Sequence, residues 1–276
     1  MARKKRMATL WEVPDDLWER ISPLLDDYDP PKATGRKRED ARKILDGVIF
    51  RFRPGCQWNH IPSLYGDAST LHRTFQRWEQ IGLVEKMWSL LIEEGDELGQ
   101  VDGQWQSADS ALGKARGGGD EGGANPTDGA KNGTKRSLLV EAGGGPLAVV
   151  VAPADQLDAQ LREATLEAIG VECPKPTAKN PQHLCLAKAD DNPTGEAAVE
   201  QYNYTEHIRR KGEEKLNKKT KKKHPARRWV VERTLAWLSK CRGLLVRYEK
   251  KSRNYLALLQ FACALLWYRR LAYSSF

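Results

Sequence analysis

The apolar residues of this 276-residue chain change their spacing about a third of the way along it. Up to about residue 98 they recur every three or four positions, as on one face of a helix: Leu17, Ile21, Leu24 and Leu25, then Ile44, Leu45, Val48, Ile49 and Phe52. Beyond Gly99, two β-rich runs, 135–141 and 146–152, flank Gly143-Gly144-Gly145 and predict a β-hairpin. This change of period excludes a purely helical fold and a purely β fold.

The segments around the hairpin predict a mixed fold. We expect a short strand at 105–110, a helix over 156–169, strands at 183–187 and 207–210, and closing helices over 226–241 and 252–273. Glycine-rich residues 113–133 predict an extended, mobile loop. Strand, hairpin, helix, strand and then helices indicate a mixed α/β sheet with helices on its faces. The predicted domains are therefore a helical one over residues 1–98 and an α/β one over residues 99–276.

Residues 58–80 predict a helix-turn-helix. A short helix over 58–64 would be followed by the turn Tyr65-Gly66-Asp67 and a second helix over 68–80. Leu71, Phe75 and Trp78 form the core side of the second helix. Its polar side would contact DNA through Ser69, Thr70, Arg73, Gln76 and Arg77. A polar surface helix with no ligand would have the same pattern.

Basic residues are concentrated near the end of the chain. The net charge of +8 and the pI near 9.2 favour a polyanionic partner. Residues 209–253 contain eighteen Lys and Arg against four Glu. Such a run either forms a solvated surface or binds phosphates. We expect it to contact DNA, with Lys221, Lys222 and Lys223 in the interface.

The five cysteines have neither metal-ligand nor disulfide spacing, so we expect buried thiols in a reducing compartment. Residues 256–268 form the most apolar stretch and are too short to span a bilayer. No apolar run follows the basic residues 3–6, as it would in a signal peptide. The sequence therefore predicts a cytoplasmic, nucleoid-associated protein without a membrane partner.

Two acidic residues are candidates for metal ligands. Asp109 lies in a short strand directly ahead of the hairpin, where burying a carboxylate is costly unless it is paired or binds a cation. Glu232 follows Arg228 by four residues in a helix. The alternatives are a surface carboxylate at a strand end for Asp109 and an intrahelical ion pair for Glu232.

Together these segments resemble the insertion-sequence transposases of the IS5 family, in the group near IS427. The resemblance covers nearly the whole chain. Its motifs are residues 13–18, 53–58, 75–78, 125–128, 133–140, 227–234 and 254–259.

The resemblance implies an RNase H-like catalytic domain, preceded by the helical DNA-binding domain, in which three carboxylates hold two Mg²⁺, with Mn²⁺ as a possible substitute. Asp109 matches the first ligand and Glu232 the third. Lys135, Arg136, Arg227 and Arg228 are expected to contact DNA. Water would cleave the strand at the terminal inverted repeats, and the freed 3′-hydroxyl would then attack target DNA. A homodimer or larger homo-oligomer on paired ends is expected.

The chain departs from the family at the second ligand. Where members of this group carry an aspartate after Leu-Cys-Leu, this sequence has Ala187. A methyl group cannot bind Mg²⁺, and Asp190, three residues further on, is the candidate substitute ligand. A decayed copy, a ligand knockout and a site rewired through Asp190 remain open. The alternative function is a catalytically inactive, sequence-specific DNA-binding protein, and an RNase H-like nuclease acting on RNA is a third hypothesis.

Overall fold

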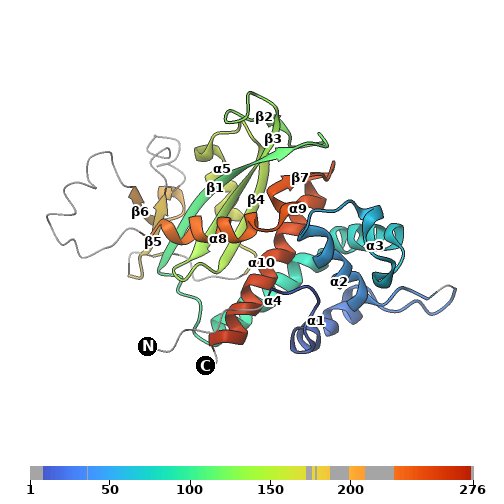
Figure 1. The fold of residues 1–276 in the computed structure, drawn as a ribbon. Coiled ribbons are helices and arrows are strands. Elements are labelled where there is room, and N and C mark those ends of the chain that lie inside the picture. Colours follow the sequence, from blue (N-terminus) through green and yellow to red (C-terminus); the bar gives the residue numbers. More distant parts are fainter. Residues whose placement is uncertain are drawn as a thin grey trace, which may run out of the picture.

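The computed structural model describes residues 9–35, 37–171, 176–177, 179–186, 199–208 and 227–274 (Figure 1). In chain order the elements are α1 (Asp15–Tyr28), α2 (Ala41–Phe52), the 3₁₀ turns η1 (Trp58–His60) and η2 (Ser63–Tyr65), α3 (Ala68–Gln80), α4 (Leu83–Glu97), β1 (Trp105–Ala115), β2 (Gly123–Ala124), β3 (Asn132–Glu141), β4 (Pro146–Pro153), α5 (Asp158–Glu167), β5 (Gln182–Leu186), β6 (Tyr204–Ile208), α8 (Trp229–Ser239), α9 (Arg242–Leu245), β7 (Val246–Arg247) and α10 (Ser252–Ser274). The described strands all follow residue 99, as the change of period predicts.

Short polar side chains fix the starts of two helices in the N-terminal region. Asp40 caps α2 by accepting a hydrogen bond of 2.8 Å from the backbone N–H of Arg42. Asp67 caps α3 in the same way, accepting from the backbone N–H of Thr70 at 2.8 Å. Each cap satisfies donors that the first helical turn leaves unpaired.

The predicted first helix of the helix-turn-helix is wrong. Residues 58–64 form the two 3₁₀ turns η1 and η2 instead of an α-helix. Pro62 explains the difference, because proline lacks an N–H and disfavours helical backbone in the residue before it. Ile61 accordingly has extended dihedral angles, with φ −70° and ψ 132°. The helix predicted over 68–80 is confirmed as α3.

The sheet mixes antiparallel and parallel pairing. Its order is β2-β3-β1-β5-β6, with β4 also on β3 and β7 on β1. β3 runs antiparallel to β1 and β4, whereas β5 is parallel to β1 and β6 is parallel to β5. This pairing confirms the predicted mixed α/β class and agrees with the RNase H-like fold that the resemblance implies.

Helices cover both faces of the central strand β1. Successive side chains of a strand point to opposite faces. Ser107 donates to the backbone carbonyl of Arg227, just before α8, at 3.3 Å. Ser110, on the other face, donates to Asp158 in the first turn of α5 at 2.5 Å. Asp109 therefore belongs to the face that α8 crosses in Figure 1.

The glycine-rich segment contains more regular structure than the predicted loop. β1 extends to Ala115, β3 begins at Asn132, and β2 pairs with β3 between them. Gly119 has a φ of 106°, and a Cβ added there would lie 2.1 Å from the carbonyl oxygen of Lys250. The glycines thus allow this segment to approach the backbone ahead of α10 closely.

The long helix α10 joins the sheet to the helical region. Trp267 donates from its indole N–H to the carbonyl of Pro146 at 2.7 Å, and its ring lies against Gly95 of α4. Tyr268 donates to Asp16 of α1 at 2.7 Å. The two regions therefore share one hydrophobic core, and the domain boundary near residue 98 stays a prediction. Among the described helices, none is both long and apolar enough to cross a membrane.

Candidate active site

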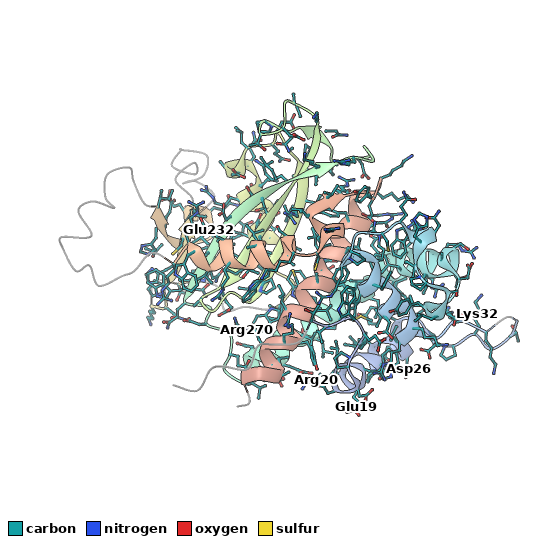
Figure 2. The ribbon with its side chains drawn as sticks, viewed as in Figure 1. Glu19, Arg20, Asp26, Lys32, Glu232 and Arg270 are labelled. Atoms are coloured by element: carbon teal, nitrogen blue, oxygen red, sulfur yellow. The ribbon has the colours of Figure 1, made fainter. Side chains whose placement is uncertain are left out.

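Asp109 and Glu232 lie close together although 122 positions separate them in the sequence. The Nη2 atom of Arg228 is 3.2 Å from Asp109 Oδ2 and 3.1 Å from Glu232 Oε1. β1 carries the aspartate, and α8, which packs across it, carries the glutamate (Figure 2). The fold thus brings two carboxylates to one guanidinium group.

The backbone of β1 holds Asp109 in place. Its side chain is 14% exposed, and Oδ1 accepts a hydrogen bond from the backbone N–H of Ser110 at 2.9 Å. Burial raises the pKa of the Asp109 carboxyl above its usual range, and the positive charge of Arg228 opposes that rise. The Asp109 carboxylate therefore needs a nearby cation.

Glu232 has a more open environment than Asp109. It lies in the first turn of α8, and its side chain is 51% exposed. The amino end of a helix carries a partial positive charge that favours a carboxylate. One of the two carboxylates is therefore fixed by the sheet, and the other is accessible from solvent.

Two converging carboxylates suit a hard divalent cation, which prefers oxygen ligands. The guanidinium of Arg228 already shows that a positive charge is accommodated between them. Within the described ranges, no three His, Cys, Asp or Glu side chains gather into a metal-binding group. Ala187 and Asp190 lie outside the described residues, so the third ligand stays a prediction. β5 is described as far as Leu186.

Lys135 and Arg136, two of the predicted DNA contacts, have side chains that are buried within the protein. Lys135 pairs with Asp158 at 3.2 Å and donates to the carbonyl of Gln156. Arg136 is 1% exposed and donates to the carbonyl of Leu244 at 3.0 Å. Since β3 is covered on both faces, its charged side chains have partners inside the fold.

The side chains of α3 that are predicted to contact DNA differ in their exposure and in their hydrogen bonds within the protein. Ser69 and Arg73 are exposed, and Gln76 is half-buried. The hydroxyls of Ser69 and Thr70 donate to the capping Asp67 at 2.6 and 2.9 Å. Arg77 forms two hydrogen bonds with Asp29, at 2.6 and 3.2 Å, which direct its guanidinium towards α1. The DNA contacts of α3 stay predictions, as do those of Lys221, Lys222 and Lys223, which lie outside the described residues.

A row of rings on the same face of the sheet as Asp109 is absent from the sequence-based predictions. Trp105 of β1 stacks on His183 of β5 with 4.3 Å between ring centroids, and its ring also lies 4.9 Å from that of His207 of β6. The guanidinium of Arg227 lies 4.6 Å from the Trp105 ring centroid. Trp105 and Asp109 are four residues apart in one strand, so they share a face. The even spacing of Trp105 and Asp109 in the sequence could have predicted that the two side chains lie on one face of the sheet.

Two family models match the chain. The model described as "Putative transposase of IS4/5 family" covers residues 13–88, and the model described as "Transposase DDE domain" covers residues 95–267. The second alone spans more than half of the chain.

Known proteins agree with the family models. The chain is similar to the "Putative transposase for insertion sequence element IS402" of Burkholderia cepacia, with 30% identity over 54% of this chain and 69% of that protein. A 16.2 kDa protein of the same element is 30% identical over 41% of this chain and 80% of its own length. An uncharacterised protein of Sinorhizobium fredii, y4sN, is 29% identical over 37% of this chain and 74% of its own.

Among solved structures, the catalytic domain of Mos1 mariner transposase aligns with 72% of this chain and 93% of its own length, at 9% identity and a TM-score of 0.29. A score this low does not establish a shared fold, so the fold assignment depends on the strand order and the family models. The matches over both halves of the sequence place it in one family: the chain belongs to the insertion-sequence transposases with a DDE domain.

Proposed function

We propose that this chain binds the terminal inverted repeats of an insertion element as duplex DNA and cleaves strands there, with divalent metal ions held by Asp109 and Glu232. The observation that carries the proposal is the convergence of these two carboxylates on Arg228. Mg²⁺ is the expected ion, and Mn²⁺, which prefers the same oxygen ligands, would substitute.

Each residue of the site has a separate part in the proposed reaction. Asp109 provides a fixed ligand, because the backbone N–H of Ser110 and the β1 ladder restrain its carboxylate. Glu232 provides a ligand on the solvent side of the site. When bound, the metal ions would activate the attacking oxygen and stabilise charge on the leaving oxygen. Arg228, released from the carboxylates, would then neutralise a nearby phosphate.

The proposed reaction has two successive attacks at phosphorus. Water first hydrolyses the phosphodiester at the element end and leaves a 3′-hydroxyl. That hydroxyl then attacks a phosphodiester of target DNA, forming a new P–O bond as the old one breaks. Strand joining, an oligomer that holds two ends, and a cytoplasmic location belong to the same proposal.

Ala187 favours a second candidate function, a DNA-binding protein without catalysis. By the resemblance, the residue stands where the family carries its second ligand. Loss of a carboxylate ligand would weaken metal binding while leaving the helical region unchanged. Such a protein would bind element ends without cutting them.

The test is metal-dependent cleavage of a duplex that carries the element end. We expect Ala187→Asp to raise the cleavage rate by about 100-fold or more, the scale on which losing even an indirect metal contact acts. Asp109→Asn, made in the Ala187→Asp background, is the control and should abolish cleavage. End binding is measured in parallel by fluorescence anisotropy.

Three results would separate the candidates. Equal, robust cleavage by the wild type and Ala187→Asp would show that Ala187 does not limit the site. Binding of the end without cleavage by either protein would leave the non-catalytic function. Absence of specific binding would contradict both.

A further inference from the structure

Residues 248–253, here called the basic loop, comprise the connection from β7 to α10 and the first two residues of α10, and they expose three positively charged side chains. Lys250 and Lys251 are exposed, Tyr248 is 45% exposed, and the Arg253 side chain is 47% exposed. The segment lies next to α9, where the sheet meets the helical region (Figure 1). It lies within the basic run 209–253 that is predicted to contact DNA, but none of the individually predicted contact residues falls in it.

A buried arginine fixes the backbone of the basic loop. Arg247 is 0% exposed and donates to the carbonyls of Glu249 at 2.8 Å and Lys250 at 3.0 Å. It also donates to Asp120 at 2.8 Å, and the same Asp120 oxygen accepts from the backbone N–H of Ser252 at 2.5 Å. The loop therefore has a defined shape, with its lysines directed outward.

A second buried contact connects the basic loop to the helical region. Glu249 points inward, and its Oε1 lies 2.5 Å from Arg51 Nη2 of α2, with both side chains at most 3% exposed. The Arg51 guanidinium also lies over the ring of Trp58, at 5.3 Å from its centroid. Trp58 in turn stacks on His72 of α3, with 4.5 Å between ring centroids.

The loop also contacts α3 directly. Arg253 Nε is 3.5 Å from Glu79 Oε2. Burial lowers the pKa of His72, and the positive charges of Arg51 and Lys251 act in the same direction. His72, Gln76 and Glu79 share one side of the helix, because residues three and four apart are neighbours there. The basic loop thus lies along the side of α3 that carries Gln76.

Burying the charged side chains of Arg51, Glu249 and Arg247 costs free energy that a simple connection between a strand and a helix would not require. Taking arginine and glutamate side chains out of water carries a penalty that their attraction barely offsets. A solvated turn between a strand and a helix requires no such charges. In some proteins, buried ionic groups that add little stability hold a particular geometry.

We infer that the basic loop and the Gln76 side of α3 form one rigid surface for duplex DNA, in which Lys250 and Lys251 bind backbone phosphates. The inference rests on the proposed function and extends it, because it adds a phosphate-binding segment from the far end of the sequence to the helical region. A chain of net charge +8 favours a polyanion over a protein partner at such a patch. The lysines would fix the position of the duplex, and base recognition would come from α3.

The test uses the full chain and measures binding of an element-end duplex by fluorescence anisotropy over a salt series. Lys250→Gln combined with Lys251→Gln removes two charges. Lys32→Gln combined with Lys179→Gln is the control, because both lysines are exposed, Lys32 lies between α1 and α2 and Lys179 just ahead of β5, and the charge change is the same (Figure 2 labels Lys32). Thermal unfolding of both double variants should match the wild type, since the four side chains are not buried.

We expect the Lys250/Lys251 variant to lower the slope of log K against log salt by about two, roughly one per phosphate contact, and the control to leave it unchanged. The loss of affinity should be the same for an unrelated duplex, since phosphate contacts do not read sequence. Gln76→Ala should instead reduce the preference for the element end.

An unchanged slope in a variant that still binds DNA would overturn the inference and leave the proposed function standing. A loss confined to the element-end duplex would also overturn it, because the lysines would then be reading bases. A wild-type chain that binds no DNA would overturn both.

Discussion

Two clusters of arginine and carboxylate side chains in this transposase have the same chemistry but opposite environments. In the site, Arg228 joins Asp109 and Glu232, and the three side chains are 42%, 14% and 51% exposed. Beneath the basic loop, Arg51 pairs with Glu249 at 2% and 3% exposure. The part-exposed ion pairs of Arg228 cost little to break, whereas breaking the buried Arg51–Glu249 pair leaves an uncompensated charge inside the protein. The two clusters contain the same types of residue, and the extent of burial is what distinguishes the candidate active site from the structural ion pair.

The largest expected effect comes from breaking the buried pair. Glu249→Gln keeps the shape of the side chain but leaves the Arg51 charge without compensation, which should lower the free energy of unfolding by about 3–5 kcal/mol. Chemical denaturation measures it. The matched control is Glu232→Gln at the site, for which we expect a change within about 0.5 kcal/mol. Equal effects at the two positions would show that burial does not distinguish the two clusters.

A smaller effect of opposite sign is expected at Asp109. Because burial raises the pKa of its carboxyl in the folded state, folding is disfavoured once pH rises above the unfolded value of about 3.9. Asp109→Asn removes that penalty and should stabilise the protein at pH 7 by up to about 1 kcal/mol. The gain should disappear below about pH 3, where the aspartate is protonated in both states. Thermal unfolding at the two pH values checks this, and destabilisation at pH 7 would contradict it.

The smallest effect on stability is expected for Arg228→Gln. Its ion pairs are part-exposed, so the free energy of unfolding should change by less than about 0.5 kcal/mol. The pKa of Asp109 should rise further, because Arg228 lowers it in the wild type. A carboxyl NMR titration of Asp109 measures that rise. An unchanged titration would mean that Arg228 does not neutralise the site.

Regular periodicity made much of the fold predictable. The 3.6-residue pattern located α1, α2, α3 and α10, and the Gly143–Gly145 turn between β-rich runs located β3 and β4. Asp109 on a strand and Glu232 on a helix followed from the same patterns. Short elements were missed, as α9 and β7 are, because four and two residues are too few to show a period.

Tertiary burial could not be predicted from the sequence. Arg136 lies between Lys135 and Ser137 in a polar stretch of β3, which is compatible with a solvent-facing side chain, yet α8 and α9 cover it. Arg51 and Glu249 lie in segments far apart in the sequence, and neither has a local feature that points to the other. The sequence shows that two basic residues, Arg227 and Arg228, precede Glu232. It does not show that Arg227 lies over the Trp105 ring or that Arg228 contacts Asp109.

The position of α10 has a consequence for how the chain folds. Trp267 and Tyr268 complete contacts with α4, β4 and α1, so the hydrophobic core of the first hundred residues is closed by the last thirty. During synthesis the N-terminal helices emerge long before their partner does, and contacts of such large sequence separation form slowly. The nascent helical region therefore carries exposed apolar surface until α10 has left the ribosome.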